Sequence, residues 1–175
     1  MSSQAMNPLL CDTETGLCEI GEGVKAVTIT YFTDPICSSC WGIEPQLRKL
    51  KLEYGDYFDI DYRMGGLLPS WDIYNSGGIS KPGDVASHWY EVSEHYEMPI
   101  DGDVWLEDPL ASSYPPSVAF KAVQKQNPSL AVRYLRRLRE LVFVQKTNIA
   151  KAEVLQEVAL DLDIDIGQFQ SDIEG

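Results

Sequence analysis

The sequence predicts an α/β fold in which a strand–helix–strand unit is followed by helices alone. Residues 27–33 are mostly β-branched and aromatic, with Val27, Ile29 and Tyr31 alternating with Thr28, Thr30 and Phe32, and they predict a strand. A helix is predicted over 38–54, where Trp41 and Leu50 fall at helical spacing, and a second strand over 58–64, where apolar residues recur at every second position. A connection of this length implies parallel pairing in a right-handed βαβ unit.

Proline and capping residues divide the rest of the chain into helices. Asn127 precedes a proline and Asp165 precedes an apolar stretch, so both are predicted N-caps. The region 98–116 contains four prolines and is predicted to be irregular. The predicted helices span residues 84–97, 116–125, 127–145, 150–162 and 165 onward.

The turn between the first strand and its helix contains the motif DPICSSCW. Cys37 and Cys40 stand at the start of the helix, where a disulfide can close across the first turn. Free helix N–H groups and the positive end of the helix dipole stabilise a thiolate at this place. The pattern predicts thiol–disulfide chemistry, with Cys37 as nucleophile and Cys40 as resolving thiol. A zinc site and a purely structural pair are the alternatives.

Several neighbours of the cysteines are candidate supporting residues. Ser38 and Ser39 can donate hydroxyl hydrogen bonds to the thiolate. Trp41 either packs over the disulfide or belongs to the core. Pro45 lies inside the predicted helix and is expected to kink it.

Two carboxylates near the cysteines oppose thiolate formation. Asp34 precedes Cys37 by three residues, and Glu44 follows Cys40 by four residues, which places Glu44 on the side of Cys40. A buried Glu44 can pass a proton to the resolving thiol. The commoner case is a solvated surface glutamate.

The motif and its strand resemble the active-site segment of a thioredoxin-fold protein. The downstream features resemble the DsbA family in its FrnE-like branch, namely a strand at 60–64 that leads into a long helical insertion and a late segment from Phe143 to Phe169. The resemblance covers residues 24–175. It implies a thioredoxin-like βαβ core with a helical insertion, and it implies that the C-terminal ββα part of the fold, with its cis-proline loop, is missing from this chain. The implied function is a protein-disulfide oxidoreductase or isomerase. A redox-sensing adaptor of the same fold, without turnover, is the alternative.

The expected organisation has three parts: an arm over 1–26, the βαβ segment with the CxxC motif over 27–66, and a helical insertion domain over 67–175. The arm is expected to be irregular. Its Cys11 and Cys18 flank turn-forming residues, so they are a possible second redox pair; free thiols and metal binding are the alternatives.

A long loop over 65–82 joins the second strand to the first helix of the insertion. Loops of this length are often functional. Its bulky apolar residues are expected either to cover the core or to form an apolar lip beside the cysteines: Leu67, Leu68, Trp71 and Tyr74.

Charge and composition limit the partners. The formal net charge is −13, which disfavours nucleic acid and anionic membrane surfaces. The first residues lack a signal-peptide pattern and no apolar run is long enough for a membrane span, so a cytoplasmic location is expected. The expected partner is a disulfide-containing protein or a small thiol substrate. A homo-oligomer formed through an open sheet edge is possible.

The remaining titratable clusters predict no metal site and no cofactor. His88 and His95 are two turns apart on one predicted helix, which is too far for two ligands of one ion. A run of arginines on another helix predicts a solvated, salt-bridged face. It comprises Arg133, Arg136, Arg137 and Arg139.

Overall fold

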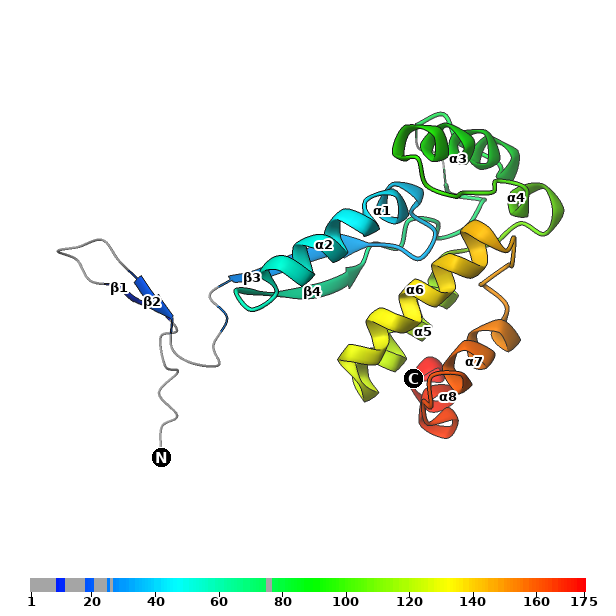
Figure 1. Ribbon diagram of the computed structural model, residues 1–175. Helices are drawn as coiled ribbons and strands as arrows, with labels where there is room; N and C mark the ends of the chain where they lie inside the picture. The colour runs from blue at the N-terminus through cyan, green and yellow to red at the C-terminus, as the bar shows by residue number, and fades with distance from the viewer. Residues whose placement is uncertain (1–8, 12–17, 21–24, 26, 75–76) are drawn as a thin grey trace. The chain divides into compact units, whose positions relative to one another are not determined.

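The structure is a computed structural model, and it describes residues 9–11, 18–20, 25, 27–74 and 77–175 (Figure 1). Contacts divide the chain into two compact units. The first unit contains the residues up to Phe32 together with Pro45–Arg63. The second contains Thr33–Glu44 and Met64–Gly175.

The first unit contains the predicted strand–helix–strand arrangement. Strands β3 (Val27–Thr33) and β4 (Phe58–Met64) form a two-stranded parallel sheet, and α2 (Glu44–Tyr54) lies between them in the chain. The α/β fold class is therefore confirmed. Among the described residues of this unit, Phe58 is the single buried side chain. On α2 the apolar side chains of Leu50 and Tyr54 are exposed, at 40% and 52%.

A second sheet lies in the arm, where the sequence predicts irregular structure. Strands β1 (Leu9–Cys11) and β2 (Cys18–Ile20) pair antiparallel, and Cys11 and Cys18 are register partners. The expectation of a wholly irregular arm is therefore wrong. The turn residues between the two cysteines lie outside the described residues, as do the side chains of both cysteines.

The predicted helix after the first strand is divided in two. Helix α1 (Ser38–Gly42) ends at Ile43, and α2 begins at Glu44, with Pro45 in its first turn. Proline has no N–H to donate and its ring clashes with the carbonyl four residues earlier, so the helix is interrupted rather than only kinked. Gly42 allows a close approach at this point, because a Cβ there would lie 2.5 Å from Cγ of Tyr96.

The second unit is helical. Its elements after α1 are α3 (Pro82–Tyr96), α4 (Val104–Glu107), α5 (Tyr114–Gln126), α6 (Pro128–Val144), α7 (Ala152–Leu160) and α8 (Ile166–Glu174). The predicted helices are confirmed, whereas α4 lies in the stretch predicted to be irregular. Both predicted caps are present, since the Asn127 side chain accepts from the N–H of Ser129 and Leu130 and the Asp165 side chain accepts from that of Gln168.

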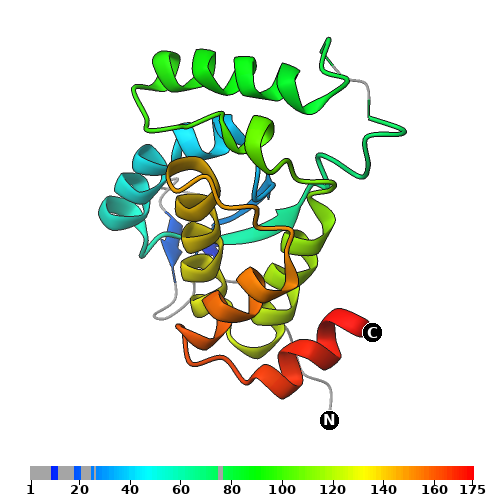
Figure 2. The ribbon, with the colours of Figure 1, turned by 90° about the vertical axis from the view of Figure 1, so that its right-hand side faces the viewer.

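Helices α5 and α6 run side by side, and α7 and α8 pack against them (Figure 2). The core between these helices is well buried: Phe120, Tyr134, Leu138 and Phe169 are each 0% exposed. The Tyr134 hydroxyl donates a hydrogen bond of 3.0 Å to the carbonyl of Leu155, and burial raises the pKa of this tyrosine. Helix α3 instead contacts α1 and α4.

Candidate functional site

Cys37 and Cys40 form a disulfide across the first turn of α1, with their Cα atoms 5.2 Å apart. Cys37 is the N-cap residue, and its Sγ accepts a hydrogen bond of 3.3 Å from the backbone N–H of Cys40. The Cys37 N–H in turn donates to the carbonyl of Asp34, which fixes the preceding turn. In the reduced form, an N–H aimed at Cys37 Sγ favours the thiolate.

The residues beside the cysteines differ in exposure. Ser38 is buried, whereas Ser39 is exposed. Trp41 is buried in the core, where its ring stacks on Phe143 at a centroid distance of 5.8 Å and its indole N–H donates to the carbonyl of Pro99. Of the two roles expected for Trp41, these contacts fit the core residue.

Asp34 is buried and joins three segments that are far apart in the sequence. Its carboxylate accepts from the N–H of Ile36 at 3.1 Å, from the N–H of Leu67 at 2.8 Å and from the hydroxyl of Ser113 at 2.9 Å. Burial is the main influence on this carboxyl and raises its pKa. Asp34 therefore holds Leu67, in the loop after β4, and Ser113, the residue before α5, against residues 34–37, which form the cysteine turn.

A second buried group lies on the other side of that turn. Glu44 is 8% exposed, and its carboxylate pairs with Arg136 at 3.0 Å and with Arg139 at 3.6 Å. Arg139 is 3% exposed and also donates to the carbonyl of Asp34 at 3.1 Å and to the hydroxyl of Thr33. Glu44 is thus a buried, paired carboxylate rather than a solvated one.

The prediction of a fully solvated arginine face is wrong at Arg139. Arg136 and Arg137 follow the prediction, since both are partly exposed and pair with Glu140. Arg139, however, falls in the apolar stripe of α6 with Leu135 and Val142, four residues after one and three before the other. That register is the signal in the sequence that distinguishes Arg139 from its neighbours.

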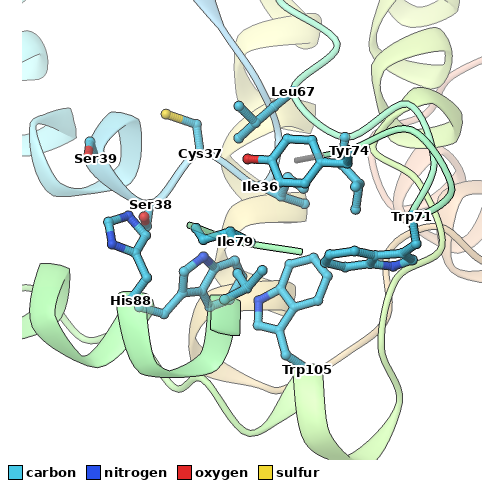
Figure 3. A pocket seen from close by; sticks show the side chains of 13 residues that line it. Ile36, Cys37, Ser38, Ser39, Leu67, Trp71, Tyr74, Ile79, His88 and Trp105 are labelled. Carbon is cyan, nitrogen blue, oxygen red and sulfur yellow. The ribbon is translucent and has the colours of Figure 1, made fainter. Parts of the chain in front are cut away.

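An apolar pocket of about 220 Å³ lies beside Cys37 (Figure 3). The turn and α1 contribute one wall, the loop after β4 contributes another, and α3 and α4 contribute the remainder. The four loop residues predicted as an apolar lip all line it, although Leu68 is at the same time a core residue with 3% exposure. The lining comprises Ile36, Cys37, Ser38, Ser39, Leu67, Leu68, Trp71, Tyr74, Ile79, Val85, His88, Trp89 and Trp105.

Aromatic rings build the deep part of this pocket. Trp105 lies edge-to-face against Trp71 at 5.9 Å and against Trp89 at 5.3 Å. The indole N–H of Trp71 donates to the carbonyl of Leu110 at 2.9 Å, which fixes the ring. The ring of Trp89 also contacts that of Phe143, with their centroids 4.5 Å apart. Because Phe143 stacks on Trp41, the aromatic contacts extend from the pocket to Trp41. The local sequence pattern missed Trp89 and Trp105 as lining residues, because they meet the loop only in the fold.

The two histidines of α3 lie apart. His88 is exposed at the pocket, whereas the ring of His95 packs edge-on against Tyr96. Within the described residues, no group of three or more His, Cys, Asp or Glu side chains is arranged to hold a metal ion. Every helix in this described part of the chain is too short or too polar to cross a membrane.

Among curated relatives, the ClpXP adapter protein SpxH of Halalkalibacterium halodurans is 39% identical over 177 residues. The match covers 95% of this chain but 58% of that protein. A second SpxH, from Shouchella clausii, is 36% identical, and the match covers 93% of this chain and 55% of the relative. The chain thus spans little more than half the length of these relatives.

Two solved structures share the fold. A putative protein disulfide isomerase from Nitrosomonas europaea matches with a TM-score of 0.70 and 19% identity, over 85% of this chain and 70% of that one. The cytosolic disulfide reductase DsbM from Pseudomonas aeruginosa matches with a TM-score of 0.66 and 23% identity, over 83% and 69%. A family model described as thioredoxin matches residues 31–175. The chain therefore belongs to the thioredoxin family.

Proposed function

We propose that this chain is a redox-sensing protein-binding module of DsbA-like fold, which presents a protein partner to a protease of the ClpXP type. The observation that carries the proposal is the similarity to a ClpXP adapter along 95% of the chain. The same similarity and the CSSC motif are consistent with the FrnE-like branch of the DsbA family. Because the chain spans only part of its relatives, its activity and partners in the whole protein are part of the proposal.

The helical unit supplies a surface suited to a protein partner. The pocket beside Cys37 is apolar and aromatic, and aromatic rings are enriched where protein partners bind. The loop that forms one wall is fixed by the bond from the Leu67 N–H to Asp34 and by the bond from the Ser113 N–H to the carbonyl of Leu68. A preformed surface loses little conformational entropy on binding.

The disulfide makes this surface sensitive to redox state. When Cys37 and Cys40 are reduced, the S–S bond across the first turn of α1 is absent and Cys37 carries a thiol at the pocket rim. A partner disulfide can then be attacked by the Cys37 thiolate: a bond forms between Cys37 and one partner sulfur, and the other partner sulfur leaves as a thiolate and takes up the proton. The Cys40 thiolate ends the capture by attacking the Cys37 sulfur: the Cys37–Cys40 disulfide forms again, the bond to the partner breaks, and the partner sulfur leaves as a thiolate and takes up a proton, so the partner is released in its reduced form.

The second candidate function is that of a thiol–disulfide oxidoreductase or isomerase. Cys37 at the N-cap, with the Cys40 N–H aimed at its sulfur, is the observation that favours it. The partner would be a disulfide-containing protein or a small thiol. We propose a cytoplasmic location for either function, because one relative is a ClpXP adapter and one solved neighbour is a cytosolic reductase.

Two assays separate the candidates. Reduction of insulin by dithiothreitol is measured with the wild-type chain and with Cys37→Ser. Proteins from the source cells are captured on both immobilised forms, and each captured protein is then tested for faster degradation by purified ClpXP when the chain is added. Faster degradation with the wild-type chain supports the adaptor, and its persistence in Cys37→Ser would show that the partner is held by the surface without a bond to Cys37. Insulin turnover that is lost in Cys37→Ser, without any faster degradation, supports the enzyme and contradicts the adaptor.

A further inference from the structure

We propose that the pocket beside Cys37 receives one large apolar side chain of a partner peptide, next to the partner cysteine that exchanges with Cys37, and that it rejects glutathione. This inference rests on the proposed function in one respect, namely that Cys37 exchanges with a partner sulfur. It adds the chemistry by which the partner is chosen.

The size of the pocket fits a single side chain. Its volume of about 220 Å³ exceeds the roughly 150 Å³ of a cavity that admits benzene. It is smaller than the roughly 300–1,000 Å³ of pockets that enclose whole small molecules. One aromatic ring or one branched aliphatic side chain therefore fills it.

The lining selects an apolar occupant. Trp71, Tyr74 and Trp105 present rings, and Leu67 forms an apolar rim that is 45% exposed. None of the described residues that line the pocket is Lys, Arg, Asp or Glu, and His88 is its one imidazole. An aromatic or leucine side chain gains by leaving water for such a surface.

Charge excludes glutathione. That tripeptide carries two free carboxylates, and the lining offers no lysine or arginine to pair with them. The net charge of the chain, −13, adds long-range repulsion toward any anionic thiol. A neutral peptide with a bulky apolar residue beside its cysteine meets neither obstacle.

The position of Cys37 couples the pocket to exchange. Cys37 is itself a lining residue, and the stick view places it next to Leu67 at the edge of the pocket, with its sulfur directed away from the Leu67 side chain (Figure 3). A side chain seated in the pocket therefore holds an adjacent peptide sulfur near Cys37. Holding two reactants together raises the rate of their reaction.

The test uses Cys40→Ser, in which the mixed disulfide on Cys37 accumulates. Reduced protein is mixed with one of three disulfides: the dimer of acetyl-Gly-Phe-Cys-Gly-amide, the dimer of acetyl-Gly-Ser-Cys-Gly-amide, or oxidised glutathione. The Cys37 thiolate attacks one sulfur of each, a Cys37–peptide bond forms, the original S–S bond breaks, and the released thiolate takes the proton. Mass spectrometry of quenched samples gives the rate constants.

The phenylalanine peptide is expected to react at least about tenfold faster than the serine peptide and than oxidised glutathione. Leu67→Lys is then added to Cys40→Ser. It places a cation at the rim that can pair with the carboxylates of glutathione, so the rate constant for oxidised glutathione is expected to come closer to that for the phenylalanine peptide. Leu52→Lys is the matched control: it makes the same substitution at a side chain that is 83% exposed and outside the lining. It should leave the ratio unchanged.

Equal rates for all three disulfides would overturn the pocket assignment while leaving thiol exchange at Cys37 intact. A ratio that shifts equally in both lysine variants would also overturn it, because net charge and not the rim would then set the preference. A Cys37 that reacts with none of the three would overturn the inference together with the redox half of the proposed function. Capture of partners in the adaptor assay is measured independently of all three results.

Discussion

The two units of this chain contain similar amphipathic elements but bury them to different extents. Leu138 on α6 is 0% exposed, whereas Leu52 on α2 is 83% exposed. In the strand–helix–strand unit Phe58 alone of the described side chains is buried, while the helical unit holds the aromatic cluster around Trp89. A local pattern is therefore enough to form a helix or strand, but burial requires partner elements.

The cysteine turn takes its surroundings from the better buried unit. The contacts group Thr33–Glu44 with the helices, and the residues that fix the turn come from α6 and from the start of α5. The turn that precedes Cys37 is thus held by Arg139 and Ser113, more than 70 residues away. Five predictions sharpen this contrast, beginning with the largest expected effect.

Removing the buried cation should destabilise the helical unit strongly. Arg139→Met leaves Glu44 without one of its two cations and removes the donor to the Asp34 carbonyl. We expect the free energy of unfolding in urea to fall by about 3–5 kcal/mol, the cost of breaking a buried ion pair. Arg137→Met is the control: that side chain is 39% exposed and pairs only with Glu140, so about 0.5 kcal/mol is expected. Equal losses in both variants would contradict a buried role for Arg139.

A matched pair of leucine truncations tests the contrast itself. Leu138→Ala removes a fully buried side chain and should lower the free energy of unfolding by about 2–5 kcal/mol. Leu52→Ala removes an exposed one and should change it by no more than about 0.5 kcal/mol. Urea unfolding followed by circular dichroism measures both. A loss at Leu52 close to that at Leu138 would mean that the helix α2 is covered in solution.

The same difference explains how much the sequence revealed. The βαβ order, the CxxC motif at a helix start and the caps at Asn127 and Asp165 are all written in residues close together in the chain, and each is correctly predicted. Arg139 binds the Asp34 carbonyl from 105 positions away in the sequence, and Ser113 binds the Asp34 carboxylate from 79 positions away. A local sequence pattern does not predict partners at such separations. Short elements such as α4 and β1 are too brief to produce a periodic signal.

The hydrogen bonds to Asp34 should have a smaller effect than the buried ion pair. Asp34→Ala leaves three donors without an acceptor, and we expect a loss of about 1–3 kcal/mol. Ser113→Ala keeps the carboxylate but removes one of those donors and the acceptor of the Leu68 N–H, so a loss of about 1–2 kcal/mol is expected. A loss in Ser113→Ala that exceeds the loss in Asp34→Ala would contradict the central place of the carboxylate.

Asp34 also predicts the direction of a pH effect. Burial raises its pKa above 3.8, so the folded protein holds this proton more tightly than the unfolded chain does. The part of the Asp34 contribution that is linked to its protonation is therefore complete below pH 3.8 and is lost as pH rises through the raised pKa. Urea unfolding from pH 3.5 to pH 7 should show this part as a decline in stability relative to Asp34→Ala, in the wild type and in Ser113→Ala. An identical pH profile in all three proteins would refute the assignment.

The smallest expected change in stability concerns the sheet, where the prediction is one of association. Strand β3 exposes Val27 at 52% and Phe32 at 70%, and a two-stranded sheet leaves backbone N–H and C=O groups unpaired along its outer edges. We expect light scattering to give a mass above the 19.6 kDa of one chain, rising with concentration.

Thr30→Lys adds a charge to the exposed side of β3 and should shift the mass toward one chain, with a stability change of no more than about 0.5 kcal/mol. Gln170→Lys adds the same charge to an exposed position on α8 and should leave the association unchanged. A mass of 19.6 kDa at every concentration would show that the edge of β3 does not pair with a second copy. An equal shift in both variants would assign the association to net charge instead of the strand.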